Sequence, residues 1–257
     1  MRPFKKLPGA LFRALGYYPT RLRGAPLRVD PNHWRFWRKA ARGLWEPDTL
    51  ALLEQQLSPQ MTVCDIGAWI GPTVLCAAQR CRHVYCFEPD TAAYAELLRN
   101  LQLNAARNVT PFNLALTARD GTRRLASFGG EPGDSRSSLL ATAEAGAATE
   151  VIGLSWTRWL EIAQPPRIDF LKIDIEGGEF ELLPAMSDYL ASQRPPLLLS
   201  THAPYLESAA RAAAMRRLAD ALRGYRRCTT PQGEAVGVEA LLAPDACQHF
   251  RTFFLTD

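Results

Sequence analysis

Acidic residues stand beside two apolar stretches that end like buried strands. Asp65 lies in the apolar run of residues 62–66, which breaks at Gly67 and Gly71. Glu88 follows a second apolar run. A carboxylate at such a strand end accepts paired hydrogen bonds from vicinal ribose hydroxyls, and a second carboxylate beside the turn suits an ammonium group. These residues predict a pocket for a nucleoside that carries an amino acid.

The glycine spacing argues against a phosphate group in this pocket. A dinucleotide turn has the pattern G-x-G-x-x-G, and its middle glycine lets the backbone approach a pyrophosphate. Here Trp69 stands in the middle position between Gly67 and Gly71, and no G-x-x-x-x-G-K-[ST] cradle occurs. S-adenosylmethionine is the cofactor that fits. A nicotinamide oxidoreductase is a weaker alternative, and another is that the glycines only form a turn that the carboxylates cap.

A second group of residues could handle a proton. Methyl transfer to a hydroxyl needs alignment and a base, and Asp174, Glu176 and His202 are predicted at the same sheet edge. His202, with an ordinary pKa of about 6.5, is the candidate base, although it could instead hydrogen-bond a loop backbone. Asp174 could position the acceptor or the cofactor ammonium. We assign no metal, but Asp174, Glu176 and Glu179 are an alternative set of ligands for a divalent ion.

Alternating strands and helices must position these residues. Short apolar runs separated by helical patterns predict a mainly parallel sheet. Helices are expected from Pro72 to about Cys81, from the cap residue Asp90 to about Asn104, and beyond Gly178. The expected strands are residues 62–66, 83–87, 109–116, 168–173 and 197–201, and residues 225–228 and 249–255 are expected to form a closing antiparallel hairpin after a helix at 206–223.

Two segments lie outside this alternation. Residues 121–150 are rich in Gly, Ser and Ala, and we expect a loop or weak hairpin over the carboxyl edge of the sheet, where it would shape a substrate site. A disordered loop is an equal alternative.

At the N-terminus, Trp34, Phe36, Trp37 and Trp45 are interleaved with basic residues. We expect an amphipathic helix that packs on the domain and helps to close the site. We therefore divide the chain into a basic, aromatic, helical extension (1–58) and a catalytic domain (59–257).

Charge and composition restrict the partners. The formal net charge is +4, which is too small to imply a nucleic-acid partner by itself, although basic and aromatic residues so mixed can bind nucleic acid or sugar. The apolar residues near Leu11, flanked by basic ones, could contact an anionic membrane surface. No run reaches the length of a membrane span, so we expect a soluble, cytoplasmic protein. The six cysteines are expected to be free thiols.

The sequence resembles the FkbM-type, S-adenosylmethionine-dependent methyltransferases. The motifs that carry the resemblance span roughly residues 60–202: Asp65-Ile66-Gly67-Ala68-Trp69-Ile70-Gly71, Phe87-Glu88-Pro89, the run from Leu98 to Val109, and Leu171-Lys172-Ile173-Asp174-Ile175-Glu176-Gly177-Gly178-Glu179. The resemblance implies an α/β fold of the class I methyltransferase (Rossmann-like) type, with a mainly parallel sheet, a C-terminal antiparallel hairpin and helices on both faces.

The resemblance also implies function and site residues. The activity would be O-methylation of a hydroxyl on a small-molecule, sugar or secondary-metabolite acceptor. Two residues depart from the family pattern, since Trp69 stands where Asn is common and His202 follows a strand after which many members have Glu. A nucleic-acid-binding protein on a methyltransferase-like scaffold is the alternative. The expected cofactor-binding residues are Asp65, Gly67, Ala68, Gly71, Glu88, Asn113, Ala115 and Asp174, and the expected catalytic residues are His202, Asp174 and Glu176.

Overall fold

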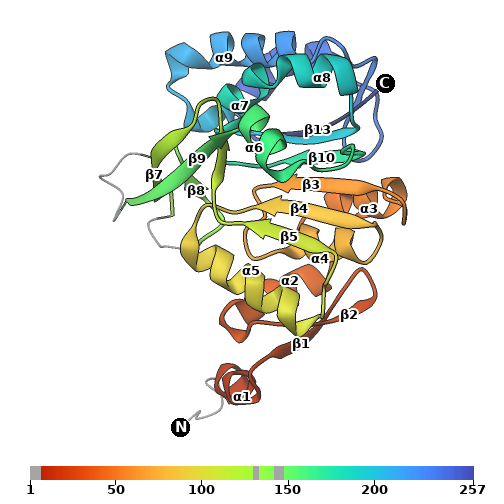
Figure 1. Ribbon diagram of the computed structural model, residues 1–257, viewed down its shortest axis with the longest axis vertical. Helices are drawn as coiled ribbons and strands as arrows, with labels where there is room; N and C mark the ends of the chain where they lie inside the picture. Colours follow the sequence, from red (N-terminus) through yellow and green to blue (C-terminus); the bar gives the residue numbers. More distant parts are fainter. Residues whose placement is uncertain (1–6, 130–132, 142–147) are drawn as a thin grey trace.

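A seven-stranded sheet forms the centre of the computed structural model, which describes residues 7–129, 133–141 and 148–257 (Figure 1). Five neighbouring strands run parallel, and β13 is antiparallel to the strands on either side of it. In spatial order the strands are β12 (Arg227–Thr229), β13 (Arg251–Thr256), β11 (Leu197–Thr201), β10 (Phe170–Ile173), β3 (Thr62–Ile66), β4 (His83–Phe87) and β5 (Val109–Phe112). This is the class I methyltransferase sheet that the sequence predicts.

Helices cover both faces of the sheet because side chains alternate along its buried strands. On β10, Phe170 belongs to one apolar core and Leu171 to the other. The first core packs beneath α2 (Trp34–Ala41), α3 (Pro47–Gln56), α4 (Pro72–Ala78) and α5 (Thr91–Leu103). The second packs beneath α6 (Trp156–Ala163), α7 (Glu179–Ala185), α8 (Ser187–Gln193) and α9 (Ser208–Ala221).

Most of the expected strands and helices are present, and β3, β4 and β11 have the expected bounds, but several segments differ. The run 109–116 is not one strand: β5 ends at Phe112, and β6 (Ala115–Thr117) joins another sheet. Between the two strands, the Asn113 side chain donates to the backbone carbonyls of Glu88 and Pro89. The C-terminal strands are antiparallel as expected, but η4 (Val238–Leu242) and α10 (Pro244–Gln248) lie between them.

The segment 121–150 forms part of a second, four-stranded sheet rather than a loop alone. Its strands lie in the order β6, β9 (Thr149–Ser155), β7 (Gly121–Ser127) and β8 (Ser137–Ser138). Figure 1 shows β7, β8 and β9 beside the arrowheads of β3, β4 and β5, which places the insertion at the carboxyl edge as predicted. Residues 130–132 and 142–147 of the insertion lie outside the described part of the chain.

The N-terminal extension contains strands as well as helices. Between α1 (Leu7–Leu15) and η1 (Pro31–His33), β1 (Tyr18–Leu22) and β2 (Ala25–Val29) form an antiparallel hairpin, so the prediction of a purely helical extension is wrong. The amphipathic helix is confirmed as α2, with Trp37 buried and Arg38 exposed. Trp37 shares the apolar core of Val74 and Phe170, so extension and sheet pack as one body.

Candidate functional site

A cavity of about 400 Å³ opens at the carboxyl ends of β3, β4, β10 and β11, a size typical of small-molecule sites. Seven of the residues expected from the sequence line it: Gly67, Ala68, Glu88, Ala115, Asp174, Glu176 and His202. Asp65, Gly71 and Asn113 are not among the lining residues. The cavity therefore brings together most of the residues predicted to bind the cofactor and all three predicted to be catalytic.

The turn after β3 passes unusually close to the end of β10. Gly67 has φ +91°, and a Cβ atom at this position would lie 1.8 Å from the backbone oxygen of Asp174. Its amide and that of Ala68 both donate to the carbonyl of Phe87 on β4. Only glycine allows this approach without strain, and the approach holds the turn against both neighbouring strands.

Glu88 and Trp69 form one wall of the cavity. The Glu88 carboxylate, 5% exposed, accepts hydrogen bonds from the backbone N–H groups of Trp69 and Asp90, each at 2.8 Å. Burial raises the pKa of Glu88 to about 7, against the opposing effect of these two hydrogen bonds. Trp69 has φ +47°, and its indole N–H donates to the carbonyl of Gly133 in the insertion at 2.9 Å.

Asp65 lies behind the turn. Its carboxylate accepts from the Thr73 hydroxyl at 2.5 Å and from the Lys172 ammonium at 3.0 Å. The two charged residues are direct neighbours in the β3–β10 register, on the same face of the sheet. Burial would lower the pKa of Lys172, but Asp65 and then Asp174 outweigh it and raise that pKa. Lys172 and Asp65 thus form a buried ion pair behind the turn.

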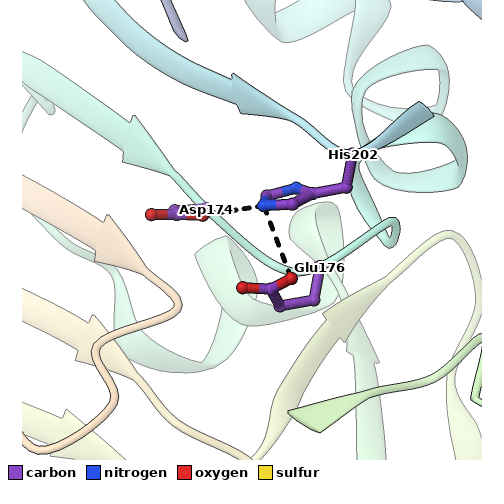
Figure 2. Close-up of side chains that lie close together, drawn as sticks. All are labelled: Asp174, Glu176 and His202. Atoms are coloured by element: carbon purple, nitrogen blue, oxygen red, sulfur yellow. Dashed lines mark ion pairs between the residues drawn. The ribbon is translucent and has the colours of Figure 1, made fainter. Parts of the chain in front are cut away.

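Figure 2 shows the side chains of Asp174, Glu176 and His202 pointing toward one another, and all three residues line the cavity. The Nε2 atom of His202 lies 3.4 Å from Oδ1 of Asp174 and 3.5 Å from Oε2 of Glu176. Asp174 directly follows β10, His202 directly follows β11, and Glu176 stands in the loop before α7 with φ +52°. Neighbouring parallel strands that end at one edge explain why residues 28 positions apart meet here.

Glu179 holds this cluster from behind. Its side chain is fully buried; Oε1 accepts from the His202 backbone N–H at 2.7 Å and lies 3.2 Å from the His202 Nδ1. The other carboxylate oxygen accepts from the Gly177 N–H at 2.9 Å. The alternative ligand set of Asp174, Glu176 and Glu179 is consequently not what the structure brings together, since His202 occupies the third position.

The surrounding carboxylates shift the titration of this cluster. Burial would lower the pKa of His202, but the hydrogen bond and charge of Glu179, then Asp174 and Glu176, raise it to about 9. Burial raises the pKa of Glu176 to about 7, against the attraction of His202. The imidazolium form of His202 is therefore a weaker acid in this site than in an isolated histidine, which differs from the ordinary pKa assumed from the sequence.

Sequence reasoning missed several residues that line the cavity. They include Glu46 from the extension, Arg136 from the insertion, and Tyr205 and Phe250 after β11 and before β13. The ring of Tyr205 stacks on Phe128, with centroids 3.8 Å apart. The aromatic stretch that ends at Trp45 was a usable signal, because we expected it to help close the site. Tyr205 and Phe250 stand in no comparable pattern.

The extension uses its aromatic residues for packing. Phe36 contacts Trp69 with ring centroids 4.6 Å apart, and Trp37 is 1% exposed. Stacked bases would need such rings at the surface, so a nucleic-acid interface is not favoured here.

Leu11 and Leu15 are exposed, and the contact of these residues with an anionic membrane surface stays a prediction. None of the helices that the structure describes is long and apolar enough to cross a membrane. All six cysteines are free thiols, as predicted.

Comparison with known proteins gives matches along most of this region. The family model described as "Methyltransferase FkbM domain" matches residues 65–227. The hexuronic acid methyltransferase AglP of Haloferax volcanii is 27% identical over 157 residues, which are 61% of this chain and 62% of that protein. The alignment thus spans less than two thirds of the relative's own length.

Solved structures with a similar arrangement are more distant in sequence. The methyltransferase FkbM of Methylobacillus flagellatus is 14% identical, with a TM-score of 0.44 over 84% of this chain and 60% of that one. A precorrin-6y C5,15-methyltransferase from Geobacter metallireducens is 16% identical, with a TM-score of 0.43 over 81% of this chain and 86% of that one.

Proposed function

Because the chain belongs to the FkbM methyltransferase family, we propose that it transfers a methyl group from S-adenosylmethionine to a hydroxyl of a sugar or other small acceptor. The observation that carries this proposal is the shared cavity. Its lining includes the Gly67 turn and Glu88 together with the cluster of Asp174, Glu176 and His202. A cofactor site and a group able to handle a proton therefore face the same space.

The cofactor side of the cavity fits S-adenosylmethionine in its chemistry. Glu88 lines the cavity as a carboxylate at the end of β4, suited to the ribose hydroxyls, and Trp69 stands where a pyrophosphate would need glycine. Glu46 and Asp174 also line the cavity and suit an ammonium group. When bound, the cofactor supplies an electrophilic methyl group on a sulfonium. The protein would orient it through the Gly67 turn and Glu88.

The other side of the cavity suits a ring-shaped, polar acceptor. Tyr205 and Phe250 present aromatic surface, with ring centroids 5.1 Å apart, on which the apolar face of a pyranose could pack. Arg136, whose side chain is 54% exposed, pairs with Asp134 at 3.8 Å. A guanidinium in this setting can pair with an anionic sugar. AglP acts on a hexuronic acid by its name, which supports a sugar acceptor for this chain.

Calorimetry with S-adenosylmethionine and a transfer assay test the proposal together. We expect the cofactor to bind and its labelled methyl group to reach a member of a panel of hexuronic and neutral glycosides. Glu88→Ala should weaken cofactor binding at least tenfold because it removes the acceptor of two ribose hydrogen bonds. The matched control Glu161→Ala removes an exposed carboxylate on α6 and should leave binding unchanged. Absence of cofactor binding by the wild-type protein would reject the proposal.

A further inference from the structure

We propose that Asp174, Glu176 and His202 bind a divalent transition-metal ion. One ligand atom from each residue lies within 4.8 Å of the others. The separations of 3.4 and 3.5 Å between the imidazole Nε2 and the two carboxylates exceed the ~2.7–3.2 Å of a strong N–H···O hydrogen bond. They match the roughly 3.0–3.5 Å between neighbouring ligand atoms that each lie about 2.1 Å from one metal.

The Nδ1 atom of His202 contacts a carboxylate in the way that is common for metal-binding histidines. A metal-binding imidazole generally donates its other ring N–H to a carboxylate, a backbone carbonyl or water, which fixes the tautomer and the ring orientation. Here Nδ1 of His202 faces the fully buried Glu179 at 3.2 Å, and Glu179 also accepts from the His202 backbone N–H. Nε2 is thereby directed toward the cavity-facing carboxylates.

Charge at the cluster also favours a cation. Asp174, Glu176 and Glu179 place three carboxylates around one imidazole, so negative charges outnumber the imidazole charge even when His202 is protonated. The Lys172 ammonium has its closer contact with Asp65, at 3.0 Å against 3.9 Å to Asp174. The His202 side chain is 8% exposed, so solvent does little to offset this excess of negative charge. A bound divalent ion would balance it.

The cluster leaves room for a substrate atom. The side chains of Asp174 and Glu176 are 21% and 18% exposed, and both line the cavity. Three protein ligands with open positions are typical of catalytic metal sites, whereas structural sites are closed. Oxygen ligands together with one imidazole suit Mn²⁺, Fe²⁺ or Zn²⁺ better than Mg²⁺ or Ca²⁺.

This inference deepens the proposed function and rests on it only for the role of the ion. A hydroxyl bound to such an ion loses its proton more easily, as metal-bound water does, and that proton would leave to solvent at the cavity mouth. Metal binding itself depends only on the geometry of the three ligand side chains and of Glu179, which positions His202. It can therefore be measured without cofactor, acceptor or turnover.

The test is a Mn²⁺ titration of the full-length chain after chelator treatment, followed by electron paramagnetic resonance. We expect a single ion per chain, with nitrogen coupling from one imidazole in the pulsed spectrum. His202→Asn should remove that coupling and weaken binding at least tenfold, and Glu176→Gln and Asp174→Asn should each weaken it by a similar factor. Glu179→Gln, which alters a positioning residue, should weaken it tenfold or more while keeping the nitrogen coupling.

The matched control is His249→Asn, since His249 also lies beside a carboxylate, Asp245 at 3.0 Å, but is exposed. It should bind Mn²⁺ as the wild type does. If His202→Asn fails to fold by circular dichroism, the two carboxylate variants decide. Failure of the wild type to bind Mn²⁺, Co²⁺ and Zn²⁺, or unchanged binding in the folded variants, would overturn the inference. S-adenosylmethionine titration in chelator separates this result from failure of the proposed function.

Discussion

Gly67 brings the turn after β3 close to the cluster of Asp174, Glu176 and His202, because its backbone lies against the backbone of Asp174. A methyl group here would meet the Asp174 carbonyl at 1.8 Å in a backbone conformation that L-residues avoid. We expect Gly67→Ala to lower the free energy of unfolding by more than about 3 kcal/mol and to weaken cofactor binding.

Gly24 provides the control for this substitution. It has φ +83° in the β1–β2 hairpin, and a Cβ there would meet no atom within 4 Å. Gly24→Ala should therefore show the conformational cost alone, roughly 1 kcal/mol. Equal losses for the two variants in urea denaturation would contradict the proposed close contact.

Asp65 can be tested as a residue of the core rather than of the cofactor site. Asp65→Asn would leave the Lys172 ammonium, 5% exposed, without its nearest carboxylate. Removal of one partner from a buried ion pair costs about 3–5 kcal/mol, and we expect a loss near the lower value because Asp174 remains at 3.9 Å. Urea denaturation measures this loss. A large fall in cofactor affinity without loss of stability would restore the sequence-based role of Asp65.

The residue types at the site could be predicted from the sequence, but not all of their contacts. Strand ends placed Glu88, Asp174 and His202 at one edge because parallel strands share that edge. The contact of the Asp65 side chain could not be predicted, because its partner Lys172 lies opposite it on β10. Only the register of β3 and β10 shows this pairing. The role of Trp69 depended on the insertion, since its indole partner is the carbonyl of Gly133.

At the scale of elements, η1 is tied to α5 by an ion pair with a defined pH dependence. Nδ1 of His33 lies 2.7 Å from Oε2 of Glu96. This hydrogen bond raises the pKa of His33, against the opposing effect of burial. A folded pKa above the unfolded value means that protonation stabilises the fold, fully below the unfolded pKa of about 6.5.

The contribution of this pair should be lost as the pH rises through the folded pKa of His33. We expect wild type to exceed Glu96→Gln in the free energy of unfolding by roughly 0.5–1 kcal/mol at pH 5.5. The difference should shrink toward zero at pH 8.5. Urea denaturation at the two pH values measures it, and a difference that grows with pH would contradict the assignment.

Strands that form short, buried apolar runs were predicted well, whereas the strands of the N-terminal extension were not. The limits of β3, β4 and β11 coincide with the expected ones, because each is a short, buried apolar run. The β1–β2 hairpin carries Pro19, Arg21, Pro26 and Arg28 on its exposed positions and lacks a continuous apolar pattern. Its fold depends on Leu22, Leu27 and Val29 packing into a core that only the assembled molecule supplies.

At the scale of the whole molecule, the extension and the sheet share one apolar core. Leu27 and Trp37 from the extension join Ile70, Val74 and Phe170 in it. We expect a single calorimetric transition in which the van't Hoff and calorimetric enthalpies agree. A separate low-temperature transition, with its loss of tryptophan signal from the extension, would show that residues 1–58 unfold independently.

The division of the cavity lining has a consequence for how specificity can change. The proposed cofactor side is built from strand ends that the sheet fixes, whereas Trp45, Arg136 and Phe250 come from three peripheral segments. Alterations in those segments change the shape and charge presented to an acceptor while the Gly67 turn stays intact. Exchange of residues 133–139 between family members is thus a direct route to redirect this scaffold toward new acceptors.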